Sequence, residues 1–126
     1  MYRTNIYQIN TELDIDQVCF MDLDWTLKHC DGRVPSKAYV CIYTEDTEEE
    51  PCLEYLFKRF NDPAKPDDYH GRSMSVSDVV EVISGAETKA YYCRSIGFEE
   101  IEFDSSRCAE QKVYCRDVMG REIYVR

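Results

Sequence analysis

A short segment of the chain brings together residue types that can carry out hydrolysis. His70, Ser75 and Asp78 could act as the base, the nucleophile and the orienting carboxylate. Ser73 and Ser77 supply further hydroxyls, but no G-x-S-x-G sequence, which would expose a serine on a sharp turn, accompanies them. A serine and a carboxylate spaced like Ser75 and Asp78 also bind free backbone N–H groups at turns. We therefore expect this cluster to be structural, and the protein not to be an enzyme.

Cofactor-binding patterns are not found in the sequence. Gly71, Gly97 and Gly120 stand singly and form no phosphate-binding glycine pattern. The seven cysteines include no C-x-x-C pair, and only two histidines are present, so we expect no metal site. An odd number of cysteines without a preceding secretory signal indicates reduced thiols and a cytoplasmic location, and no segment is apolar enough to enter a membrane.

Acidic residues dominate the charge of the chain. There are 25 acidic and 15 basic side chains, and the formal net charge is −10. Such an excess repels phosphate backbones and anionic membranes, so we expect no direct binding to nucleic acid or membrane. We expect a protein partner with a basic surface instead, bound by carboxylates from two segments: Glu45, Asp46, Glu48, Glu49, Glu50 and Glu54 in the first, and Glu100, Glu102 and Asp104 in the second.

Local patterns favour binding by both segments, although the first also has a structural explanation. Carboxylates next to a helix N-terminus stabilise the helix dipole, which would account for part of the first segment. Glu50 and Glu54 would nevertheless repel each other one turn apart in a helix over residues 50–60. The second segment places its carboxylates at alternate positions of an expected strand, about twice the 3.3 Å strand rise apart, which is close to twice the rise per nucleotide in DNA.

The elements that must position these residues are mostly strands. Leu53, Leu56, Phe57 and Phe60 recur at helical spacing and predict one main amphipathic helix over about residues 50–60. Alternating or β-branched segments predict strands over residues 3–9, 38–43, 79–83, 89–93, 100–104, 113–117 and 121–125. We expect a single α+β domain over residues 1–126. Its largely antiparallel sheet of six or seven strands is bent or part-closed, with the helix on one face and a C-terminal hairpin at about 112–126.

Three stretches of sequence resemble the YodL-like domain, a small module of bacterial genomes and mobile elements with no assigned activity. They are Phe60-Asn61, residues 70–80 (HGRSMSVSDVV) and residues 91–98 (YYCRSIGF). The resemblance is strongest over about residues 50–103 and includes the strand Ile6-Tyr7-Gln8-Ile9. Its signature positions are Asn61, His70, Gly71, Arg72, Ser73, Ser75, Ser77, Asp78, Tyr92, Ser95, Gly97 and Phe98. Arg72 stands where many relatives have histidine.

Charge and resemblance together suggest three functions. The first is a non-enzymatic protein-binding module of a mobile element or phage in the bacterial cytoplasm. It would inhibit a nucleic-acid-handling defence protein, in the anti-CRISPR or antirestriction manner, by occluding its basic surface. The second is an adaptor that binds through its sheet surface, and the third is a hydrolase centred on His70, Ser75 and Asp78. The sequence leaves the oligomeric state open.

Overall fold

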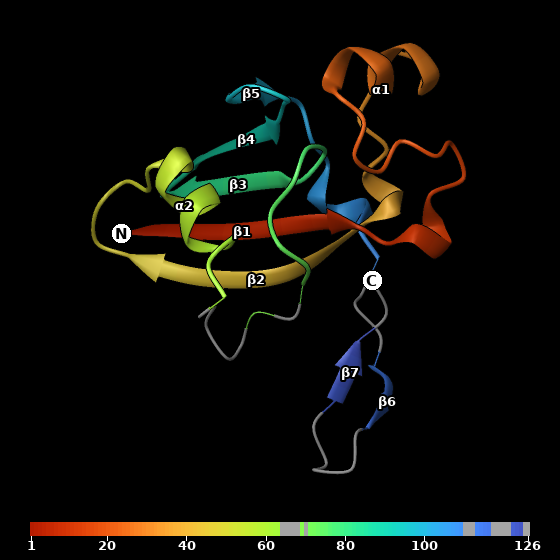
Figure 1. The fold of residues 1–126 in the computed structure, drawn as a ribbon. Coiled ribbons are helices and arrows are strands. Elements are labelled where there is room, and N and C mark those ends of the chain that lie inside the picture. Colours follow the sequence, from red (N-terminus) through yellow and green to blue (C-terminus); the bar gives the residue numbers. More distant parts are fainter. Residues whose placement is uncertain (64–68, 70, 110–112, 117–121, 125–126) are drawn as a thin grey trace.

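The fold is α+β and is built on an open, five-stranded antiparallel sheet (Figure 1). The computed structural model describes residues 1–63, 69, 71–109, 113–116 and 122–124. The sheet has the order β2-β1-β3-β4-β5. Its strands are β1 (Tyr2–Ile9), β2 (Tyr39–Thr47), β3 (Val79–Ser84), β4 (Glu87–Cys93) and β5 (Phe98–Ile101).

The expectation of one bent or part-closed sheet of six or seven strands is wrong. The last two strands, β6 (Val113–Arg116) and β7 (Glu122–Tyr124), pair with each other in a separate two-stranded sheet. They form the predicted C-terminal hairpin. The main sheet stays open because its edge strands, β2 and β5, do not pair.

The described residues form two short helices, where one was predicted. α1 (Leu23–His29) and α2 (Leu53–Arg59) have seven residues each. α2 begins later than the predicted residue 50, because β2 pairs with β1 as far as the Tyr2–Thr47 pair and residues 48–52 then lead into the helix. The part of the chain that the structure describes also contains three 3₁₀ turns: η1 (Thr11–Leu13), η2 (Ser36–Ala38) and η3 (Ser105–Arg107). Among the described residues, no helix has the length and apolar character needed to cross a membrane.

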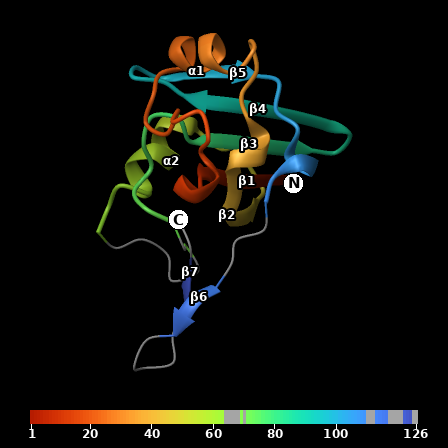
Figure 2. The ribbon, with the colours of Figure 1, turned by 90° about the vertical axis from the view of Figure 1, so that its right-hand side faces the viewer.

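Both faces of the sheet are buried. On one face, Tyr7 and Ile9 pack with Leu23 of α1 and with Tyr92. On the other, Ile6 packs in a second cluster, whose other buried members include Leu56, Phe60, Tyr69 and Met74. Figure 1 shows the two helices well apart, with α2 against the strands, and Figure 2 shows α1 beside β5. β1 is therefore a central strand that is covered on both sides.

Candidate functional site

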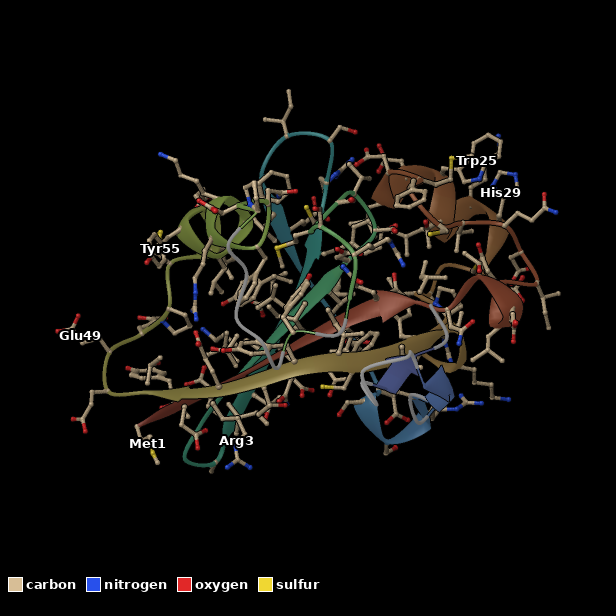
Figure 3. The ribbon with its side chains drawn as sticks, turned by 60° about the horizontal axis from the view of Figure 1, so that its bottom comes forward. Met1, Arg3, Trp25, His29, Glu49 and Tyr55 are labelled. Carbon is tan, nitrogen blue, oxygen red and sulfur yellow. The ribbon has the colours of Figure 1, made fainter. Side chains whose placement is uncertain are left out.

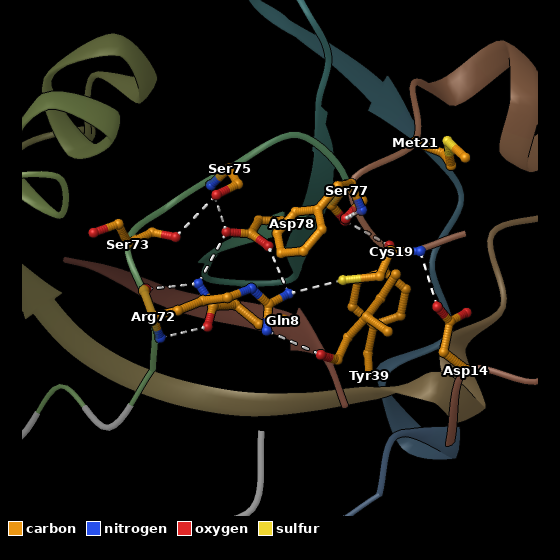
Figure 4. Close-up of polar contacts among 12 residues, drawn as sticks. Gln8, Asp14, Cys19, Met21, Tyr39, Arg72, Ser73, Ser75, Ser77 and Asp78 are labelled. Atoms are coloured by element: carbon orange, nitrogen blue, oxygen red, sulfur yellow. Dashed lines mark hydrogen bonds and ion pairs between the residues drawn. The ribbon is translucent and has the colours of Figure 1, made fainter. Parts of the chain in front are cut away.

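Asp78 lies at the centre of a polar network at the start of β3 (Figure 4). Its side chain is fully buried, and its Oδ2 accepts hydrogen bonds from the backbone N–H of Ser75 at 2.8 Å and from Gln8 Nε2 at 3.0 Å. Arg72 Nη2 lies 3.7 Å from the other carboxylate oxygen. Burial raises the pKa of Asp78 to about 7, and the bonds from Ser75 and Gln8 and the charge of Arg72 offset only part of that rise. Through its bonds to Ser75 and Gln8, the Asp78 side chain holds the loop before β3 to β1.

Arg72 connects this loop to the end of β1. Its Nη1 donates to the carbonyl oxygen of Ile9 at 3.1 Å, and its Nη2 donates to Cys19 Sγ at 3.4 Å. Its guanidinium carbon also lies 4.9 Å from the centre of the Phe20 ring. The amide of Gln8 bonds both backbone groups of Arg72, accepting from its N–H and donating to its carbonyl oxygen. Arg72, at the position where we expect histidine in many relatives, thus joins its own loop to the end of β1 and to the segment of Cys19 and Phe20.

Gly71 has a steric reason to be glycine. A Cβ atom at this position would overlap Ile42 Cδ1 and would lie 2.5 Å from Gln8 Oε1. Real side chains do not approach a Cβ so closely, and Gln8 is already fixed by its bonds to Arg72 and Asp78.

The serine hydroxyls of the cluster bind backbone groups. Ser75 Oγ donates to the carbonyl oxygen of Ser73 at 3.1 Å, and Ser77 Oγ accepts from the N–H of Phe20 at 2.9 Å. Ser77 and Phe20 both have positive φ angles, 85° and 68°, and Tyr39 Oη donates to the carbonyl oxygen of Ser77 at 2.6 Å. These contacts support the structural interpretation of the cluster. His70, the base of the hydrolase hypothesis, lies outside the described residues.

The remaining signature residues also have structural roles. The hydroxyl of buried Tyr92 donates to the carbonyl oxygen of Met21 at 2.7 Å, and the backbone N–H of Ser95 donates to Asp22 at 3.0 Å. Gly97 has a φ of 73° in the turn between β4 and β5, and Phe98 begins β5. Asn61 Nδ2 donates to the carbonyl oxygen of Phe57 at 2.7 Å and so closes the end of α2.

Two carboxylates of the first acidic segment are paired within the fold. Glu45 accepts two hydrogen bonds from Arg59 Nη1, at 2.8 and 2.9 Å, and Asp46 accepts from Arg3 across β1 and β2. Glu50 precedes α2, so the predicted repulsion between Glu50 and Glu54 within one helix is wrong. The carboxylates of this segment without an ion pair to a described residue are exposed: Glu48, Glu49, Glu50 and Glu54.

The second acidic segment borders a groove of about 1090 Å³ between α1 with its flanking loops and residues 99–107. Glu100, Glu102 and Asp104 all line this groove. Their predicted regular strand spacing is wrong, because β5 ends at Ile101. Asp104 instead starts η3, and its side chain accepts the backbone N–H of Ser106.

The groove also contains acidic residues that the sequence analysis did not select. Asp16 and Asp31 come from the irregular segments on either side of α1. These segments have no periodic sequence pattern from which the positions of the two side chains could be predicted. The thiol of Cys30 donates to Asp16 at 3.6 Å, and burial is the main cause that raises the pKa of Cys30 to about 11. At neutral pH this thiol is therefore protonated and is a poor nucleophile.

The structure separates the two acidic segments. Glu49 lies at one end of the molecule, whereas His29, which lines the groove, lies at the opposite end beside Trp25 (Figure 3). A single small partner segment would therefore engage one acidic region at a time. Within the described ranges, no three His, Cys, Asp or Glu side chains are placed to hold a metal ion.

The sequence profile of the YodL-like domain matches residues 3–103. This range includes the five strands of the main sheet, apart from Tyr2 of β1, and ends before the C-terminal hairpin. The chain belongs to the YodL-like domain family. The match extends well beyond the residues 50–103 on which the resemblance was strongest. No curated protein and no solved structure matches the chain.

Proposed function

We propose that this domain is a non-enzymatic protein-binding module, and that it binds a basic segment of a partner protein in the groove between α1 and β5. The observation that carries the proposal is the charge of the groove. Seven of its lining residues are acidic and three are basic: Asp14, Asp16, Asp31, Glu99, Glu100, Glu102 and Asp104 against Arg33, Lys37 and Arg107. Only Glu99 among these carboxylates has an ion pair with a described residue, the one to Arg94.

The shape of the groove favours it over the exposed carboxylates between β2 and α2. A concave site buries a larger part of a ligand than a connecting loop does. Its lining also includes apolar side chains, among them Leu27 and Ile101, which can contact the aliphatic part of a lysine or arginine. Charge on the groove would attract a basic partner over a distance, and the apolar contacts would then hold it.

The partner class follows from its charge. Basic surfaces are typical of proteins that handle nucleic acids. A bound domain that occludes such a surface would inhibit the protein that carries it. We therefore extend the proposal to a mobile-element or phage protein that acts in the bacterial cytoplasm against a nucleic-acid-handling defence protein. The buried state of Asp78 and the backbone bonds of Ser75 and Ser77 support the absence of hydrolase activity.

Capture from a bacterial lysate with two charge-matched variants tests this proposal. The groove variant is Asp31→Asn, Glu100→Gln, Glu102→Gln, and the loop variant is Glu48→Gln, Glu49→Gln, Glu50→Gln. Both remove three exposed negative charges, and none of these six residues has an ion pair with a described residue. A basic protein retained by the wild type and the loop variant, lost from the groove variant and released by salt is the expected result. Equal retention by both variants would contradict the proposal.

An adaptor that binds through apolar contacts is the second candidate function. The observation that favours it is the exposure of large apolar side chains near α1, with Phe20 54% exposed and Trp25 46% exposed. Isolated exposed apolar residues are common, but aromatic residues of this kind are frequent in protein interfaces. A partner lost on Trp25→Ser and retained by both charge variants, independently of salt, would favour the adaptor.

A further inference from the structure

The outer edge of β5 is a hydrogen-bonding edge of the sheet that no described strand covers. β5 is an edge strand, and its one neighbour in the sheet is β4. At the opposite edge, the backbone N–H of Ala109 donates to the carbonyl oxygen of Tyr39 on β2, and β6 and β7 lie on that same side (Figure 1). The two edges of the sheet therefore differ, because β2 already receives a contact and β5 does not receive one from a described residue.

The register between β4 and β5 shows which backbone groups of β5 point outward. Arg94 N–H donates to the carbonyl oxygen of Gly97 at 2.9 Å across the turn, so this pair is hydrogen-bonded. Antiparallel pairs alternate between bonded and non-bonded, which makes the Cys93–Phe98 and Tyr91–Glu100 pairs non-bonded.

The contacts of Cys93 agree with this assignment. Its N–H donates to the carbonyl oxygen of Asp78 at 2.8 Å, and its carbonyl oxygen accepts from Ser77, so both groups are turned away from β5. Phe98 and Glu100 therefore direct their N–H and C=O groups to the free edge. No described residue forms a hydrogen bond with these four groups.

We propose that the free edge of β5 binds an extended, basic segment of the partner as a sixth strand. This inference rests on the proposed function and specifies how the partner is held. The added strand would bond Phe98 and Glu100, and its side chains on the α1 side would enter the acidic groove, which includes Glu99 and Ile101. Strand addition supplies affinity through the main chain and selectivity through alternate side chains.

Charge identifies the occupant as a basic segment. β5 has four residues, of which Glu99 and Glu100 are exposed and acidic. Short, charged edge strands resist pairing with neutral strands. Two copies of this chain would bring β5 carboxylates together and carry a net charge of −10 each, so self-pairing through β5 is disfavoured as well. Lysine or arginine on an incoming strand removes this repulsion.

A short acetylated peptide of alternating lysine and valine is a direct probe of strand addition. The control is the same peptide with a methyl group on every second backbone nitrogen, namely those that would face β5. This change keeps the charge of the peptide and removes the N–H groups that would pair with β5. Hydrogen exchange of individual amides is followed by NMR at low salt. The expected result is slower exchange at Phe98 and Glu100 with the first peptide only. The amides of Glu99 and Ile101, already bonded to β4, should change little.

Two variants separate the backbone contact from the charge. Glu100→Pro removes an outward N–H without taking a bond from the β4 ladder, and Glu100→Gln removes the same charge while keeping the N–H. Glu100→Pro should weaken peptide binding by about tenfold more than Glu100→Gln. This is the effect expected when the one hydrogen bond from the Glu100 N–H to the peptide is lost. Wild-type amide shifts in β1 and β3 would confirm that both variants are folded.

The outcomes distinguish strand addition from the groove proposal. Equal binding of both peptides, with Phe98 and Glu100 still exchanging rapidly, would overturn strand addition and leave groove binding by charge intact. Failure of both peptides to bind would also overturn strand addition, and the lysate capture with the groove and loop variants would then decide the groove proposal by itself.

Discussion

Gln8 on β1 donates a hydrogen bond of 3.0 Å to the carboxylate of Asp78, 70 residues further along the chain. Both side chains are almost completely buried. The same amide bonds the backbone of Arg72, so one glutamine fixes residues 71–78, the signature loop, to the central strand of the sheet. The stability of the domain should therefore depend on this polar contact as well as on its two apolar clusters.

Asp78→Asn tests the buried carboxyl through pH. Because the pKa of Asp78 in the folded protein is raised from 3.8 to about 7, its protonated form stabilises the fold below about pH 4, and this contribution is lost as the pH rises through 7. The free energy of unfolding of the wild type, relative to that of Asp78→Asn, should fall by on the order of 3 kcal/mol between pH 4 and pH 8. Urea unfolding at several pH values measures this, with other carboxylates cancelling in the difference. A difference independent of pH would contradict it.

Gly71→Ala should destabilise the fold by crowding two side chains. The new methyl group would overlap Ile42 Cδ1 and Gln8 Oε1, and overpacking of this kind costs about 1–3 kcal/mol. Ile42→Val removes the overlapping Cδ1 atom. In a double-mutant cycle measured by urea unfolding, the double variant should therefore be more stable than the sum of the two single effects predicts. Additive effects would show that Ile42 does not cause the strain.

Arg94→Lys should loosen α1 from the turn between β4 and β5. Arg94 lies within 2.8–3.1 Å of Asp22, Asp24 and Glu99, and its bond is the main cause that holds the pKa of Asp22 well below its usual range. A lysine ammonium cannot match this forked geometry. Amides of α1 should exchange faster in Arg94→Lys, while those of β1 stay unchanged. Uniform acceleration across the sheet would instead indicate global destabilisation.

Neighbouring carboxylates of β2 should differ in their effect on stability. Glu45 is partly buried and receives bonds from Arg59 and from the Tyr43 hydroxyl, so Glu45→Gln should lower the free energy of unfolding by about 1 kcal/mol. Asp46 and Arg3 form an exposed pair, and Asp46→Asn should have no measurable effect on thermal or urea unfolding. A larger effect at Asp46 than at Glu45 would refute this order.

Local patterns predicted the strands well and the helix start poorly. Alternation and β-branched residues placed β1 to β4, because these signals are contained in a few adjacent residues. The start of α2 depended on how far β2 pairs with β1, a contact between Tyr2 and Thr47. Phe57 matched the helical period but is 39% exposed, since α2 turns mainly Leu56 and Phe60 inward.

The candidate site was less accessible to sequence reasoning. Gln8 occupies a position that alternation assigns to the polar, outer face of a strand, yet this face is covered by the signature loop. The groove combines Glu100 and Glu102 with Asp16 and Asp31 from distant irregular segments. The spacing of residues along the chain does not show which distant segments meet, so this groove could be found only from the three-dimensional structure.

The central position of β1 has a consequence for synthesis on the ribosome. β1 is made first, but its partner on one side ends at Thr47 and its partner on the other side begins at Val79. In a nascent chain that has emerged only as far as Arg59, β2 is available to pair with β1, but the partner for the other edge of β1 has not yet been made. That edge stays open to misplaced pairing until residues 79–84 have left the exit tunnel.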